Sequence, residues 1–275
     1  MKKKKKIENL LWILLCSGWG FVCLFPIWSL FCGTFSRDSD NLTKVIFPTS
    51  FSNGISKIAE ALSTVNIGRA AWDTLLYTLF TVAGILVISS LAAYEFSFFR
   101  FPLKKLLFGL VIISMMLPQV LYIIPLYRLV YSMGLADTLL GVSLPLMVAP
   151  LAVFIMMQFI EDLPLSFIES AKIDGAGHFC IYFRIVLPLM RNGILTTVVL
   201  MFMRIWGQYL WPSLVTAVNI KPISVTIANL LSPNYWVDSR VKIAAMLLAM
   251  LPPLLIYVLF QRYVIEGVTA SGVKG

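Results

Sequence analysis

One polar segment of the chain combines acidic and small residues at a spacing suited to binding another protein. Its sequence, ESAKIDGA, covers residues 169–176, and IVLP follows at residues 185–188. The segment lies between two hydrophobic runs, each long enough to span a membrane. Its carboxylates offer charge-assisted hydrogen bonds to a basic partner. We therefore expect this segment to receive force from another protein rather than to catalyse a reaction.

Motifs of covalent catalysis are absent from the sequence. It contains no GxxxxGK[ST] phosphate loop, no GxSxG nucleophile turn and no HExxH zinc motif. His178 is the single histidine, and a lone histidine in a polar segment is more often solvated than catalytic. The four cysteines form no CxxC pair and no cluster with histidine: Cys16, Cys23, Cys32 and Cys180. We expect no catalytic residue, no metal site and no cofactor bound by this chain.

Composition predicts a membrane protein. Hydrophobic residues make up 59% of the chain and charged residues 13%, and the mean hydropathy is +0.89, far from the mixture of a soluble domain. A bilayer core of about 30 Å requires about 20 apolar residues in a helix. Six runs meet or approach that length, so we predict an all-α protein with six transmembrane helices. Their approximate bounds are 10–34, 74–95, 106–127, 138–160, 192–215 and 241–261.

The first of these runs follows a lysine cluster, as the apolar core of a secretory signal does. However, the run from Leu10 to Thr34 exceeds the roughly 7 to 15 apolar residues of such a signal. No convincing cleavage site between small residues follows it. We therefore expect a retained membrane anchor.

Basic residues predict the orientation of the spans. An even number of spans puts both termini on one side, and segments rich in lysine and arginine stay cytoplasmic. With a cytoplasmic amino terminus, the inner segments hold Lys2 to Lys6, Arg100, Lys104, Lys105, Lys172, Arg184, Arg191, Arg262 and Lys274. The external loop at 37–70 mixes both signs of charge and gives little orienting force. The formal charge of +9 is explained by this bias beside membrane lipid, so we expect no nucleic-acid partner.

The loop at 161–191, between the fourth and fifth predicted spans, is longer than a turn requires. We predict a short helix with Pro164 in its first turn, Leu165 to Ile173 continuing it and Gly175 just past its end. Its expected apolar face comprises Phe167, Ile168 and Ala171. A small helix joined stiffly to two spans can convert a push by another protein into their tilt. The alternative is an interfacial helix that lies passively on lipid.

Prolines interrupt several predicted spans, at Pro118, Pro125, Pro145, Pro150 and Pro212. A proline frees a backbone carbonyl, which in a membrane must be satisfied by a neighbouring helix or by a watery cavity. Clustered prolines near mid-depth therefore suggest a pathway through the bundle. Transmembrane helices also tolerate proline without any cavity, so both interpretations stay open.

Three stretches resemble permease subunits of bacterial ATP-binding-cassette (ABC) importers. The first is similar to their EAA signature, through Glu169, Ser170, Ala171, Asp174, Gly175, Ala176, Ile185 and Pro188. Residues 206–212, WGQYLWP, resemble the fifth-helix motif of the carbohydrate-uptake branch, which includes maltose-type permeases and their glycerol-phosphate relatives. Residues 261–275 resemble the carboxyl terminus of the smaller permease of that branch. The resemblance is weakest at 37–70, and Ser170 stands where the family usually has alanine.

This resemblance implies the type I ABC importer permease fold and a place in a larger complex of the bacterial plasma membrane. The chain would pair with a second homologous permease, two ABC ATPase subunits that bind ATP and Mg²⁺, and an extracytoplasmic solute-binding protein. The helix at 165–173 would be the cytoplasmic coupling helix that docks in a cleft of one ATPase. There Glu169 would pair with a basic group, Ala171 would allow close approach, and Gly175 would permit the chain to reverse. The tail would reach the interface between the ATPases through Gly267, Thr269, Gly272 and Lys274.

The fifth predicted span holds the candidate contacts for a solute. If this helix is regular, Arg204, Gln208 and Trp211 share one face. Aromatic rings stack on sugars and amides bind hydroxyl groups, so the candidates for a sugar or oligosaccharide path are Arg204, Trp206, Gln208, Tyr209 and Trp211. The aromatic residues fit an interfacial belt equally well.

Arg204 stands where relatives favour a small residue, and an unpaired cation inside a membrane costs at least about 2.5 kcal/mol. We expect either an acidic partner on the other permease or an anionic solute, such as a uronate, sialate or glycerol phosphate. A secondary transporter is a remote alternative, because Asp73 and Glu95 lie at span ends rather than at mid-depth. A structural or sensory protein would need no docking loop, and exporters of the superfamily generally lack it.

Overall fold

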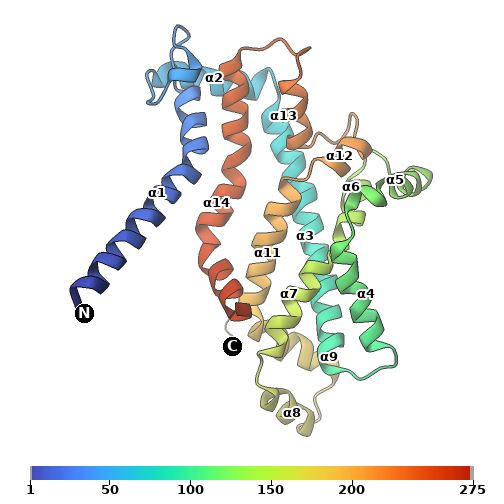
Figure 1. Cartoon of the computed structure of the whole chain (residues 1–275). Coiled ribbons are helices and arrows are strands. Elements are labelled where there is room, and N and C mark those ends of the chain that lie inside the picture. Colours follow the sequence, from blue (N-terminus) through green and yellow to red (C-terminus); the bar gives the residue numbers. More distant parts are fainter. Residues whose placement is uncertain (1, 273–275) are drawn as a thin grey trace. The chain divides into compact units, whose positions relative to one another are not determined.

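The computed structural model describes residues 2–272, and this part of the chain is helical throughout, without strands (Figure 1). This confirms the predicted all-α class. In chain order the elements are α1 (Lys2–Thr34), η1 (Leu42–Lys44), α2 (Phe51–Ser63), α3 (Ile67–Phe98), α4 (Lys104–Met116), η2 (Gln119–Leu121), α5 (Ile123–Ser132), α6 (Leu139–Met147), α7 (Pro150–Glu161), α8 (Leu165–Ile173), α9 (His178–Ile181), the π-helix η3 (Tyr182–Val186), α10 (Leu187–Leu189), α11 (Arg191–Trp206), α12 (Leu210–Val215), α13 (Ile223–Leu231) and α14 (Ser239–Gly272). They form two compact units, one of Met1–Gly68 and Thr226–Leu251, the other of Arg69–Val225 and Pro252–Gly275.

Several helices are long and apolar enough to cross a membrane. Within the described residues, three do so as single helices: Leu11–Thr34, Ile67–Phe98 and Ser239–Val264. Two bent pairs reach the required length together, α6 with α7 at 49° and His178–Leu189 with α11 at 72°. The structure therefore offers three to five candidate spans, and the number six stays a prediction.

Proline explains why the third predicted span, at 106–127, is broken. Leu117 is extended (φ −77°, ψ 119°) between the end of α4 and Pro118, which precedes the single turn η2. A proline disfavours the helical conformation in the residue before it. The same effect separates α6 from α7, just before Pro150. Pro145, by contrast, lies inside α6 without ending it.

In the first unit, charged side chains hold residues 36–57 to the start of α14. Arg240 is buried; its Nε donates to Ser36 Oγ (3.1 Å) and its Nη2 to a backbone carbonyl of the segment (2.6 Å). Lys57 of α2 lies with its Nζ 2.7 Å from Asp238 Oδ2, and this hydrogen bond raises the pKa of Lys57. The mixed charges of this segment therefore fix its structure.

In the second unit, glycines allow helices to approach closely. Gly193 of α11 faces the ring of Phe159 of α7, and a Cβ at Gly193 would lie 2.6 Å from that ring. Gly84 of α3 meets the side chain of Met147 of α6 in the same way. Small residues at helix interfaces are a main source of packing in membranes. These contacts position α3, α6, α7 and α11 around the sites described below.

A carboxylate joins two loops of the second unit. Asp137, between α5 and α6, has a positive φ of 57° and accepts hydrogen bonds from four consecutive backbone N–H groups, those of residues 217–220, at 2.8–3.2 Å. Its own N–H donates to the carbonyl of Val215 (2.7 Å). Burial acts to raise the pKa of Asp137, but the four N–H donors outweigh burial and lower this pKa to about 2.

We expect Asp137→Asn to lower the free energy of unfolding by about 1 kcal/mol at neutral pH, after allowance for solvent screening. Asparagine tolerates the positive φ but is uncharged and offers one acceptor oxygen in place of two. Because the folded-state pKa is lowered, the carboxylate stabilises the fold above about pH 4 and loses this effect as the pH falls through about 2.

The measurement is the thermal midpoint of the detergent-purified chain, wild type against Asp137→Asn, across this pH range. The difference between the two midpoints should shrink below about pH 4. A difference that stays constant down to about pH 2 would show that the charge of Asp137 does not stabilise the loops.

Candidate functional site

The predicted short helix is present as α8, but Pro164 precedes it in an extended conformation (φ −63°, ψ 116°) instead of lying in its first turn. The hydrogen bonds at the end of α8 explain the glycine that follows. Gly175 has a φ of +79°, in the left-handed region. The Ala176 N–H donates to the carbonyl of Ala171 (2.9 Å), and the Gly175 N–H donates to that of Lys172 (3.1 Å). These two bonds make a Schellman cap, which needs a left-handed residue just past the helix. Three small residues of the signature therefore build the turn.

One side chain of α8 reaches the core of the second unit. Ile168 is buried in a cluster formed by α3, α7 and the segment after α8, and Ala171 and Ala176 pack against the same cluster. Phe167, which we expected on this apolar face, is 55% exposed. The prediction was wrong for Phe167 because adjacent residues point about 100° apart on a helix.

The segment after α8 is also tied to α3. The Tyr182 hydroxyl of η3 lies 2.7 Å from Ser90 Oγ of α3, and the centroid of its ring lies 5.3 Å from that of Tyr94. Ile185 packs against the core cluster, whereas Pro188 in α10 is exposed. A displacement of α8 is therefore expected to move α3 and α7 with it.

The outer surface of this segment combines charges with exposed apolar side chains. Figure 1 shows α8 beyond the ends of α3, α7 and α9. Its exposed polar residues are Glu169, Ser170, Lys172 and Asp174. The exposed apolar residues of the segment are Phe167 and four residues that were not predicted from the sequence, Leu165, Ile173, Phe179 and Phe183. Apolar side chains gathered beside charges are typical of a protein-binding surface.

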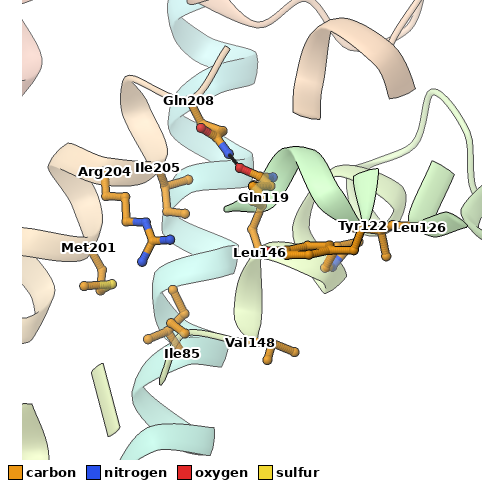
Figure 2. Close-up of a pocket in the computed structure, with 12 residues that line it drawn as sticks. Ile85, Gln119, Tyr122, Leu126, Leu146, Val148, Met201, Arg204, Ile205 and Gln208 are labelled. Atoms are coloured by element: carbon orange, nitrogen blue, oxygen red, sulfur yellow. Dashed lines mark hydrogen bonds between the residues drawn. The ribbon is translucent and has the colours of Figure 1, made fainter. Parts of the chain in front are cut away.

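A second candidate site is a recess at which three breaks between helices meet (Figure 2). Gln119 and Tyr122 come from the break after α4, Val148 and Ala149 from the break between α6 and α7, and Gln208 from the break after α11. Interrupted helices commonly line transport sites, because their free backbone groups and polar side chains need a watery cavity.

Polar side chains meet in this recess. Gln208 Nε2 donates to Gln119 Oε1 (2.9 Å), and Arg204 enters from the last turn of α11 (Figure 2). The cavity volume is about 40 Å³, enough for a few water molecules and far below the roughly 300–1,000 Å³ of small-molecule pockets. No acidic residue lines the recess, and within residues 2–272 the ion pairs do not include Arg204.

The fifth predicted span is not a regular helix. α11 ends at Trp206, and the chain turns before α12 begins at Leu210. Trp211 is fully buried and its Nε1–H donates to the carbonyl of Val142 (3.1 Å). The expected common face of Arg204, Gln208 and Trp211 is therefore wrong for Trp211, although the other two residues share the recess.

The remaining aromatic candidates also lie away from the recess. Trp206 is buried and stacks on Phe202, with ring centroids 5.6 Å apart, whereas Tyr209 is exposed outside the lining of the recess. Conversely, Gln119 and Tyr122 line the recess but were not predicted from the sequence. The available signal was a polar residue directly after Pro118 within an apolar run.

Of the predicted tail residues, Gly267, Thr269 and Gly272 fall in the last turns of α14, and Lys274 lies outside the described residues. His178 is exposed, with its ring centroid 4.7 Å from that of Phe99. Over the described part of the chain, no group of three or more His, Cys, Asp or Glu side chains is arranged to hold a metal ion.

Comparison with known proteins identifies the family of the chain. A family model described as "Binding-protein-dependent transport system inner membrane component" matches residues 84–270. The sn-glycerol-3-phosphate transport system permease protein UgpE of Rhizobium meliloti (strain 1021) is 32% identical over 283 residues, 98% of this chain and 99% of the relative. The arabinooligosaccharides transport system permease protein AraQ of Bacillus subtilis (strain 168) is 32% identical over 257 residues, 92% of this chain and 91% of the relative.

Solved structures show the same fold. A chain of a bacterial ABC transporter involved in the import of the acidic polysaccharide alginate matches with a TM-score of 0.81 and 19% identity, over 94% of this chain and 97% of that one. A chain of the inward-facing MetNI methionine ABC transporter matches with a TM-score of 0.57 and 15% identity, over 73% and 95%. Because the family model matches more than half of the chain and these relatives align over nearly all of it, the chain belongs to the inner-membrane components of binding-protein-dependent transport systems and is a permease subunit of an ABC importer.

Proposed function

We propose that this permease forms part of the path for a sugar or oligosaccharide and that a partner ATPase drives it by docking on α8. The observation that carries this proposal is the two-sided character of α8. Its inner side is fixed by Ile168, whereas its outer side exposes Glu169, Lys172 and several apolar side chains. A carboxylate at Glu169 can form a charge-assisted hydrogen bond to a basic group of the ATPase.

Force applied to α8 would reach the solute path through α3 and α7. Ile168 and the Tyr182–Ser90 hydrogen bond attach the α8 segment to these helices. Helix α3 lines the recess through Ile85, and Ala149, the residue directly before α7, lines it as well. A tilt of packed helices as rigid bodies is an established way to open a site alternately to two sides.

The path needs further subunits. A cavity of about 40 Å³ is too small for a sugar, so a second homologous permease would complete the route across the membrane. Two ABC ATPases, which carry the ATP and Mg²⁺, would supply the motion, and an extracytoplasmic binding protein would deliver the solute. The distribution of lysine and arginine favours cytoplasmic termini, with the tail from Gly267 to Lys274 directed toward the ATPases.

Arg204 favours a second candidate function, the import of an anionic sugar derivative. It lies in the recess beside two glutamine side chains and without an acidic partner in the described part of the chain. A guanidinium group binds carboxylates and phosphates in a two-pronged geometry, and amides bind hydroxyl groups. The named solute of UgpE, glycerol 3-phosphate, is such an anion, whereas that of AraQ is an oligosaccharide.

We expect Glu169→Gln and Gly175→Ala to uncouple ATP hydrolysis from transport. The first removes the charge from the proposed docking contact, worth about 1.5–3 kcal/mol, or roughly tenfold or more in solute-stimulated hydrolysis. The second strains the left-handed cap of α8. The measurement is solute-stimulated ATP hydrolysis by the complete importer in proteoliposomes.

Glu161→Gln is the matched control for the first variant, because this exposed carboxylate ends α7 just before the docking segment. It should leave stimulated hydrolysis unchanged. Normal stimulation in both Glu169→Gln and Gly175→Ala would contradict docking at α8.

For the solute, we expect Arg204→Gln to reduce uptake of an anionic sugar derivative by about tenfold or more, with little effect on a neutral one, because the lost hydrogen bonds involve a charge. Uptake of glucuronate, sn-glycerol 3-phosphate and maltose by proteoliposomes that contain the complete importer measures this preference. Arg191→Gln, the same change at the other end of α11, is the control. An unchanged preference in Arg204→Gln would exclude an anion-binding role.

A further inference from the structure

Helix α2 carries an apolar stripe that the described residues of the chain leave uncovered. At about 100° per residue, Phe51, Ile55, Ala59 and Leu62 fall within an arc of roughly 80°. All four are exposed, and Ile55 is 65% exposed. Isolated surface apolar residues need no explanation, but a continuous stripe along a helix indicates a partner.

The other two faces of α2 are a face that packs on the protein and a polar face. Toward the protein, Gly54 lies so close to the ring of Phe35 that a Cβ at Gly54 would overlap it, and Ala61 is fully buried. Lys57 lies beside this face and forms its ion pair with Asp238. The polar face holds Ser52, Asn53, Ser56, Glu60 and Ser63. α2 thus has a protein face, a water face and a third, apolar face.

Aromatic rings connect this apolar face to α1. The ring centroids of Phe51 and Phe35 lie 5.3 Å apart, those of Phe35 and Phe31 4.8 Å, and those of Phe31 and Trp28 5.7 Å. Phe47, 69% exposed, extends the surface with its ring 6.4 Å from that of Trp28. The stripe is therefore continuous with the apolar surface of a helix that is long enough to span the membrane.

We propose that α2 and Phe47 lie in the surface of the bilayer, next to the end of α1, with the apolar stripe among the lipid chains. A helix with one apolar and one polar face lies in the membrane interface with its apolar face buried by about 5–10 Å. Lipid fits this surface better than a second protein, because the stripe is continuous with the apolar surface of α1. Trp28 of α1 lies where the two surfaces meet, beside Phe47. Tryptophan is enriched at the boundary between lipid and water.

This contact rests on apolar burial rather than on charge. Many interfacial helices carry lysine and arginine on the polar face and therefore prefer anionic lipids. The single basic residue of α2, Lys57, is occupied by Asp238 and lies mostly buried. Binding of α2 to the bilayer should therefore not depend on anionic lipid.

The membrane contact would also fix the depth, relative to the bilayer, of the ion pair between Lys57 and Asp238 in the first unit. Lys57 links α2 to Asp238, directly before α14, and Gly54 packs α2 on Phe35 after the end of α1. Seated on the bilayer, one helix would hold the end of α1 and the start of α14 at the membrane surface.

Spin labels at two adjacent positions test this proposal. Ile55→Cys and Ser56→Cys are each labelled with a nitroxide in the complete importer, with the native cysteines replaced, in phospholipid nanodiscs. Both positions are exposed, so the fold should tolerate both labels. Collision with oxygen, which concentrates in lipid, is compared with collision with a water-soluble nickel chelate.

We expect the ratio of oxygen to nickel collisions to be severalfold higher at Ile55 than at Ser56, and unchanged when phosphatidylglycerol is added to phosphatidylcholine. Phe51→Cys should repeat the result of Ile55→Cys. Equal ratios at Ile55 and Ser56 would place the stripe in water and overturn the proposal. Low accessibility of Ile55 to both reagents would show that another protein covers the stripe, which would also overturn it.

Discussion

Inside a bilayer, every backbone N–H and C=O group needs a partner other than bulk water, and this constraint governs where the chain can interrupt its helices. Three interruptions, after α4, between α6 and α7, and after α11, meet at one recess. There Gln119 and Gln208 bind each other, and the space beside them can hold water. The same irregular backbone that would be costly against lipid is tolerated here because it lines a polar cavity.

The short motif of the α8 segment contains two kinds of residue, those that fix its structure and those exposed on its surface. Ala171, Gly175 and Ala176 make the cap that turns the chain, and Ile168 anchors the helix in the core. Glu169, between them, stays exposed. Substitutions at the first group would alter the shape of the segment, whereas substitution of Glu169 would alter only what the segment can bind.

The parts of this structure that could be predicted from the sequence are those set by local rules. The limits of α8 and the left-handed Gly175 follow from a proline, a glycine and the residues between them. The break at Leu117 follows from Pro118, although its position beside Gln208 does not. That contact joins residues 89 positions apart, and nothing local indicates it.

The same limit explains why the expected common face of the fifth span was wrong for Trp211. A regular fifth helix would place Trp211 beside Arg204, but the chain turns after Trp206 and Trp211 becomes a core residue bonded to α6. Tryptophan in a membrane protein fits a solute site, an interfacial belt or a core, and only tertiary packing decides among them. Arg204 and Gln208 still share the recess, because Arg204 lies in the last turn of α11 and Gln208 lies in the break that follows it.

Arg204 differs from other ionised groups of this fold in its lack of a charged or hydrogen-bonding partner among the described residues. Arg240 is buried but has Ser36 and a backbone carbonyl, and Asp137 has four backbone N–H donors. Arg204 has no counterpart of this kind in the described residues, although it lies near the middle of a predicted span. Since an uncompensated cation at that depth costs at least about 2.5 kcal/mol, its compensation has to come from water, another subunit or the solute. If the solute compensates the charge of Arg204, the recess is stabilised only while an anion is bound. The path would then favour anionic solutes over neutral ones.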